Sequence, residues 1–129
     1  MDTVADFLTR IRNASASGHE KLDVPSSRLR VGIATVLKGE GFIRNFKVVR
    51  DGKQGMMRLY LKYSGRGAPV INELRRVSRP GRRVYVASDR VPVVRSGFGF
   101  AVLSTNQGVL SSKAAKEKNL GGEVLCTIW

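Results

Sequence analysis

The spacing of apolar residues changes along this chain. They recur mainly at helical intervals up to Gly41 and mainly alternate with polar residues after it. A period of 3.6 residues predicts helices that bury one stripe, and a period of two predicts strands that bury one face. The sequence therefore predicts an α+β fold of two small packed domains. Helices should pack on a short sheet in the first, and the second should be mostly β with one short helix.

Two helices are predicted in the first half. Thr3 and Asp6 resemble a capping box for the first helix. Ser26 or Ser27 is expected to cap the second, which should end near Gly41. The two apolar stripes are Val4, Phe7, Leu8 and Ile11 in the first helix and Leu29, Ile33, Val36 and Leu37 in the second.

Two alternating segments, 42–48 and 57–63, follow these helices. The Asp51-Gly52 pair between them favours a hairpin turn. The order is therefore α-α-β-β, or α-β-α-β-β if residues 21–24 pair as a short strand.

A glycine- and proline-rich stretch, 64–69, is the best candidate linker, because these residues interrupt helices and strands. We place the domain boundary there, with an N-terminal α/β domain over residues 1–65 and a C-terminal β-rich domain over residues 66–129. The apolar residues between Val70 and Val77 fit a helix about as well as a strand, so periodicity leaves that segment open.

Short strands are predicted in the second half wherever valine and phenylalanine alternate with other residues. A short helix is expected from Ser112 to Leu120, capped by Ser111 or Ser112 and ended by Gly121. The strand positions are Val84 and Val86, then Phe98, Phe100 and Val102, and finally Val124, Cys126 and Ile128.

Basic residues outnumber acidic ones throughout the chain, 23 to 10, which gives a formal charge of +13. Both predicted domains share the excess, so the charge belongs to folded surface and not to a tail. Self-repulsion on this scale favours a polyanionic partner, and nucleic acid is the leading candidate. The rival interpretations are a DNA-binding regulator and a protein that lies on a membrane surface.

A single cysteine, Cys126, rules out an intrachain disulfide and is expected to be a packed core thiol in a reducing compartment. No apolar run approaches the roughly 20 residues that cross a bilayer. The acidic residues are scattered, and His19 has no neighbouring ligand for a metal. We therefore expect an untargeted, soluble protein that is not an enzyme and carries no cofactor or metal.

Five arginines lie between Arg75 and Arg83, directly before Tyr85. Guanidinium groups bind phosphate oxygens, and a tyrosine among arginines can stack on a base or ribose. Arg82, Arg83 and Tyr85 are therefore candidate RNA contacts, although an isolated cluster of this kind is as often a solvated face.

A polar loop, Ser104-Thr105-Asn106-Gln107-Gly108, follows an apolar strand. Its hydroxyl and amide groups suit sugar 2′-hydroxyls and base edges, but an ordinary turn has the same composition. Glu123 could hold an arginine in place, with exposed ion pairing as the default. Arg28 and Arg30 are weaker candidates, because a polar helix face normally carries such charges.

Together these segments resemble one known family, the bacterial-type small-subunit ribosomal protein number eight, over nearly the full length and in the right order. The segments that carry the resemblance are Ala5-Asp6-Phe7-Leu8-Thr9-Arg10-Ile11-Arg12-Asn13, Pro25-Ser26-Ser27, Glu40-Gly41-Phe42-Ile43, Arg76-Val77-Ser78-Arg79-Pro80-Gly81, Ser104-Thr105-Asn106-Gln107-Gly108 and Gly121-Gly122-Glu123.

The resemblance implies a two-domain α+β protein that binds the central domain of small-subunit ribosomal RNA early in assembly. It implies no reaction and makes residues 70–79 a strand. The implied partners are that RNA, neighbouring ribosomal proteins and, in some cases, the protein's own messenger RNA. The implied location is a cytoplasmic ribosome, with an organellar ribosome left open.

Most of the RNA contact is assigned by the resemblance to the C-terminal half. The loop residues Ser104, Thr105 and Gly108 would contact RNA, and Tyr85 would pack against it. Gly122 and Glu123 would lie beside the loop. The family usually has serine where this chain has Asn106. The asparagine amide can both donate and accept hydrogen bonds, as the serine hydroxyl does.

Overall fold

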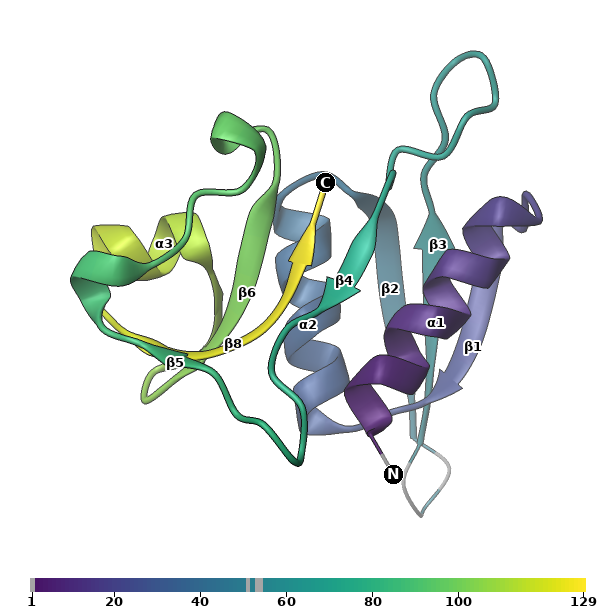
Figure 1. Cartoon of the computed structure of the whole chain (residues 1–129). Helices are drawn as coiled ribbons and strands as arrows, with labels where there is room; N and C mark the ends of the chain where they lie inside the picture. Colours follow the sequence, from purple (N-terminus) through teal and green to yellow (C-terminus); the bar gives the residue numbers. More distant parts are fainter. Residues whose placement is uncertain (1, 51, 53–54) are drawn as a thin grey trace.

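A computed structural model describes residues 2–50, 52 and 55–129. Figure 1 shows helices and strands mixed along the chain, as the α+β prediction requires. The elements, in order, are α1 (Thr3–Ala16), β1 (Lys21–Pro25), α2 (Arg28–Gly39), β2 (Ile43–Val49), β3 (Met56–Leu61), β4 (Leu74–Arg76), β5 (Tyr85–Val86), the 3-10 turns η1 (Ser88–Arg90) and η2 (Arg95–Gly97), β6 (Phe100–Thr105), β7 (Gly108–Ser111), α3 (Ser112–Glu117) and β8 (Gly122–Ile128).

The first sheet has the order β1-β3-β2, and all of its pairs are antiparallel. The short strand β1 confirms the α-β-α-β-β alternative. β2 and β3 form the expected hairpin, with Val49 opposite Met56. Of its predicted turn residues, Asp51 lies outside the described residues, and Gly52 has a φ of +85°.

The cap of α2 was predicted correctly, and the cap of α1 was not. Ser27 caps α2 by accepting a hydrogen bond from the Arg30 amide. In α1 the cap is Asp2 and not the predicted Thr3, because the Asp2 carboxylate accepts from the amides of Val4 and Ala5. The capping-box prediction placed the start of this helix one residue too late.

The second sheet is built around β8. Its strands have the order β4-β8-β6-β7, and β5 also pairs with β8. β4 and β5 pair with the same edge of β8 in succession, and β6 pairs with its other edge. Since β8 therefore has neighbours on both sides, it is the central strand of this half.

Four details of the second half differ from the sequence prediction. The strand expected over residues 70–79 is limited to Leu74–Arg76. The four-residue strand β7 was not foreseen, and α3 ends at Glu117 instead of Leu120 because Asn119 has a positive φ of 56°. Phe98 lies outside β6, with 85% of its surface exposed.

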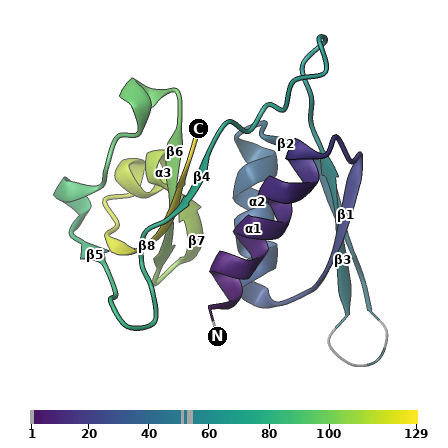
Figure 2. The ribbon, with the colours of Figure 1, turned by 45° about the vertical axis from the view of Figure 1, so that its right-hand side comes forward.

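The helices α1 and α2 lie between the two sheets, as Figure 2 shows. One buried apolar cluster includes residues of both helices and of both sheets, from Phe7 and Ile33 to Leu59 and Leu125. Cys126 belongs to it and is fully buried, which confirms a core position. This burial raises the pKa of its thiol to about 12. The boundary near residue 65 stays a prediction.

No helix among the described residues is long and apolar enough to span a membrane. The same part of the chain contains no cluster of three or more histidine, cysteine, aspartate or glutamate side chains that could hold a metal ion.

Candidate nucleic-acid interface

Three candidate residues lie in one row across the second sheet. Tyr85 of β5 is directly opposite Glu123 of β8, and Glu123 is directly opposite Ser104 of β6. Directly paired residues present their side chains on the same face, and neighbouring strands are about 4.8 Å apart. Tyr85 and Ser104 are therefore about 10 Å apart on one face, with Glu123 between them.

Glu123, in the middle of this row, is largely buried and bonds to two residues outside the row. Its side chain is 15% exposed and accepts hydrogen bonds from the Ser78 hydroxyl and from Nη1 of Arg83 at 3.0 Å. The Ser78 hydroxyl also accepts from the Val84 amide. Partial burial alone would raise the pKa of Glu123, but the bonds from Ser78 and Arg83 outweigh it and lower the pKa below its ordinary value. The bond to Arg83, whose side chain is 47% exposed, is the ion pair that was expected as the default, and a contact of Glu123 with RNA stays a prediction.

Because the pKa of Glu123 is lowered, its contribution to the free energy of unfolding should depend on pH. A depressed folded pKa adds stability above the unfolded value, near 4.5, and this contribution is lost as the pH falls through the folded pKa. We expect wild-type protein to be more stable than Glu123→Gln at neutral pH, with the difference shrinking on acidification. Urea unfolding between about pH 6 and pH 2 measures this, and a difference that does not change with pH would contradict it.

The loop after β6 is a tight hairpin turn. The Thr105 hydroxyl donates to the Gly108 carbonyl at 2.8 Å and accepts from the Gln107 amide at 3.1 Å. Gly108 has a φ of +102°, a conformation that glycine adopts without strain. Asn106 and Gln107 form the exposed tip. Because Thr105 bonds within the turn, the Ser104 hydroxyl, which has no hydrogen-bond partner among the described residues, is the freer group.

Two glycines allow the strands to approach at this row. A side-chain carbon on Gly122 would overlap the Ser104 carbonyl oxygen, and one on Gly121 would overlap the Val86 carbonyl oxygen. Gly122 and Glu123 therefore lie beside Ser104, as the sequence analysis predicted. Any RNA contact made by these residues stays a prediction.

A hollow of about 210 Å³ opens beside the row. Its lining includes Ser104, Arg83 and Glu123 from the second half of the chain, and Thr3 and Leu29 from the two long helices. At its edge the Arg76 guanidinium donates to the Asp2 carboxylate at 2.9 Å, which ties the start of α1 to the second sheet. The row therefore lies where the helices meet that sheet.

The predicted arginine run forms a turn between β4 and β5. The backbone groups of Arg79 and Arg82 bond to each other across it. Arg82 and Arg83 are exposed at the same edge as Tyr85, which is itself 69% exposed. These three candidates therefore lie together. Arg76 belongs to the run, but its side chain is only 8% exposed.

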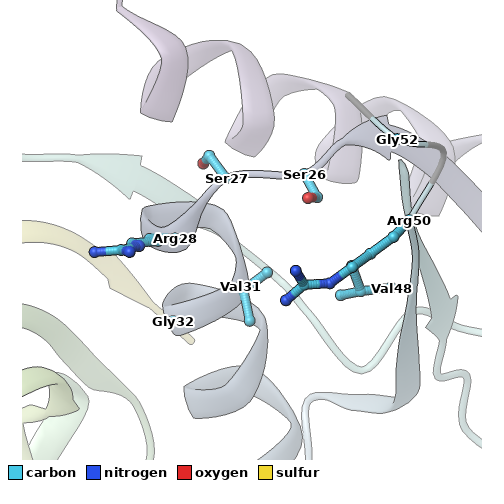
Figure 3. A pocket seen from close by; sticks show the side chains of 8 residues that line it. All are labelled: Ser26, Ser27, Arg28, Val31, Gly32, Val48, Arg50 and Gly52. Atoms are coloured by element: carbon cyan, nitrogen blue, oxygen red, sulfur yellow. The ribbon is translucent and has the colours of Figure 1, made fainter. Parts of the chain in front are cut away.

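The structure gives Arg28 and Arg30 different surroundings, and neither side chain lines the hollow beside the row. Arg30 is buried, donates to the carbonyls of Pro25 and Thr3, and lies 3.7 Å from the Asp6 carboxylate. Arg28 is exposed at a separate hollow of about 880 Å³ between α2 and the end of β2 (Figure 3). In that view Arg50 extends toward Val31 of α2, and Arg28 points away from Arg50. Arg30 thus has a structural position, and phosphate contacts by either residue remain untested.

Two residues of these surfaces escaped the sequence analysis. Ser78 is fully buried and links Glu123 to the Val84 amide. A serine within an arginine run was the only signal for it. Arg50 was missed because a basic residue beside a turn is ordinary.

Comparison with known proteins decides the family. The sequence model described as "Ribosomal protein S8" matches residues 2–129. The chain belongs to the ribosomal protein S8 family. Relatives named small ribosomal subunit protein uS8 include those of Bdellovibrio bacteriovorus, 59% identical over all of both chains, and of Geobacter sulfurreducens, 56% identical over 99% of this chain and 97% of the relative. The relative from Streptococcus equi subsp. zooepidemicus is 52% identical over the same shares.

This match confirms the family resemblance, which was stated from the sequence over nearly the full length of the chain. The ribosomal protein S8 family is one of structural proteins and not of enzymes.

Proposed function

We propose that this chain is a structural constituent of the small ribosomal subunit that binds the central domain of its RNA and supports assembly of the subunit. Binding of ribosomal RNA is the role of the ribosomal protein S8 family. We assign the contact to the C-terminal half, residues 66–129. The observation that carries this assignment is the row of Tyr85, Glu123 and Ser104 beside the exposed Arg82 and Arg83.

Each part of this surface has a chemical role in binding. The exposed Tyr85 ring offers a face for stacking, and the Ser104 hydroxyl can donate to a 2′-hydroxyl or a base edge. Arg82 and Arg83 neutralise phosphates and release counterions, which makes the affinity depend on salt. Glu123 acts on Arg83 by fixing its direction. Because the row is part of a sheet, its donors are held in place before RNA arrives.

The test removes the Ser104 hydroxyl and the Tyr85 ring in separate variants and measures RNA binding. We expect Ser104→Ala to weaken binding to a central-domain fragment of small-subunit RNA by roughly two- to tenfold, the net value of one hydrogen bond. Tyr85→Ala should weaken it by roughly five- to a hundredfold through lost stacking. Thr105→Ser is the matched control, because it keeps the hydroxyl that closes the turn.

Binding is measured in a salt series against a scrambled hairpin of equal length and charge. Preference for the fragment that survives raised salt supports the proposal. Unchanged affinity in the double variant Ser104→Ala, Tyr85→Ala would overturn the assignment of the row.

The same residues would bind a messenger RNA that folds into the same shape, so the proposal extends to the chain's own message. Competition between the central-domain fragment and the leader of that message tests this extension, since one shared site requires mutual displacement. A helix-turn-helix contact with DNA has less support, because β1 separates α1 from α2.

A further inference from the structure

The other end of β8 carries a second group of aromatic and basic side chains. Trp129, the only tryptophan of the chain, follows the strand, and two arginines lie against its ring. The guanidinium carbon of Arg95 is 4.4 Å from the ring centre, and that of Arg75 is 5.2 Å from it. With Phe98 these residues form what we call the Trp129 platform.

The backbone fixes the tryptophan. The Trp129 amide donates to the Glu73 carbonyl at 3.1 Å, and the Trp129 carbonyl accepts from the amides of Asn72 and Glu73 at 2.7 and 2.8 Å. A side-chain carbon on Gly99 would lie 2.8 Å from Cβ of Trp129, so the neighbouring chain packs closely against it. The backbone of Trp129 is therefore held in one position.

The segment that carries Arg95 and Phe98 adopts a strained conformation. Arg95 and Ser96 have φ values of 49° and 55°, a left-handed conformation that residues other than glycine rarely adopt. This conformation places the Arg95 guanidinium against Trp129 and leaves Phe98 85% exposed. A phenylalanine so exposed adds little to the core, so folding alone does not account for it.

A surface hollow of about 380 Å³ lies at the platform. Its size falls in the range of sites for small organic groups. Beneath it the Phe42 ring packs edge-on against the buried Phe100, with ring centres 5.1 Å apart. The lining residues are Phe42, Val70, Asn72, Arg95, Phe98 and Trp129.

The charges of the platform favour an anionic ligand. In the part of the chain that the structure describes, neither Arg75 nor Arg95 forms an ion pair with a carboxylate. Stacking on an aromatic ring leaves the N–H groups at the edge of a guanidinium available for acceptors. Free guanidinium edges beside an exposed aromatic ring match a phosphate joined to a flat base.

We propose that the Trp129 platform binds an unpaired nucleotide of RNA, with the base against Phe98 and the phosphate against Arg95. Trp129 follows Glu123 by six positions along β8, so this contact would lie about 20 Å from the Tyr85 row. Figure 1 shows that the end of β8 marked C is opposite the end that pairs with β5. The inference rests on the proposed function only in taking RNA as the partner.

The sole tryptophan makes a direct test possible, because its fluorescence reports on this site and not on the Tyr85 row. We expect single-stranded oligouridylate and oligoadenylate to change the Trp129 emission of the full chain in a saturable way. Phe98→Ala should weaken that binding by roughly five- to a hundredfold without lowering the melting temperature. Arg95→Lys keeps the charge but loses the planar group, and it should weaken binding as well.

Controls separate this site from general charge and from the other site. Arg66→Ala removes an exposed cation elsewhere and should leave the titration nearly unchanged. Ser104→Ala should also leave the Trp129 signal unchanged while weakening binding of the central-domain fragment. Failure of the platform and failure of the Tyr85 row are thus distinguishable.

Two results would overturn the inference. The first is an oligonucleotide titration that Phe98→Ala and Arg95→Lys do not alter. The second is a polyglutamate chain of equal charge that changes the emission with the same dependence on Phe98, which would assign the platform to an acidic protein segment.

Discussion

Arg76→Ala is expected to lower the free energy of unfolding by roughly 3 kcal/mol, because it leaves the Asp2 carboxylate without its charged partner in a mostly buried site. The Arg76 side chain is 8% exposed and that of Asp2 is 20% exposed. Arg76 also donates to the Leu125 carbonyl at 2.6 Å. Since Asp2 caps α1, the substitution loosens the contact between that helix and the second sheet. Urea unfolding measures the change.

The chain contains a matched control for this ion pair. Arg58 bonds to Asp23 through two nitrogens at 2.7 and 3.0 Å, but both side chains are more than 40% exposed. We expect Arg58→Ala to destabilise the protein far less than Arg76→Ala, since water solvates the carboxylate that remains. Equal losses in the two variants would show that burial does not set the value of the Asp2–Arg76 pair.

The effect of Arg76 should also depend on pH. Burial alone would raise the pKa of Asp2, but the bond from Arg76 and the amides of α1 hold it below its ordinary 3.8. The stability that this shift provides is present above 3.8 and is lost as the pH falls through the folded pKa. The difference between wild type and Arg76→Ala should therefore shrink in acid. In Asp2→Asn, which keeps a capping side chain, the dependence should be absent.

The sequence predicted those elements whose pattern is local. The stripes of α1 and α2 and the alternation of β2 and β3 each lie within one short segment, and all four elements form. β7 was missed because four residues after Gly108 are too few to show a period. Residues 70–73 were predicted to belong to a strand but lie outside β4. The backbone of Asn72 and Glu73 bonds to Trp129 instead.

The candidate site was predictable by residue type but not by arrangement. Tyr85 and Ser104 reach Glu123 only because β8 pairs on both edges with this register. Register between segments 19 to 38 positions apart depends on how whole strands bury their faces, which no local pattern shows. The buried positions of Arg30 and Arg76 were hidden for the same reason, since their partners lie on other elements.

Gly122→Ala is expected to lower the free energy of unfolding by about 2 to 3 kcal/mol, and to weaken RNA binding more than Ser104→Ala does. The added methyl group would overlap the Ser104 carbonyl, which belongs to backbone and cannot turn aside as a side chain could. Strand β6 must therefore shift at Ser104. Because the row depends on this register, the shift moves the hydroxyl away from Glu123 and Tyr85.

Gly121→Ala and Gly65→Ala make this prediction specific. A methyl group on Gly121 would overlap the Val86 carbonyl, so that variant should displace β5 and Tyr85 while leaving Ser104 in place. Gly65 faces open space, and its substitution should alter stability by less than about 0.5 kcal/mol. Unfolding and RNA binding are measured at a temperature where every variant is folded. If Gly122→Ala bound the central-domain fragment as tightly as wild type, RNA binding would not depend on the position that β8 gives to Ser104.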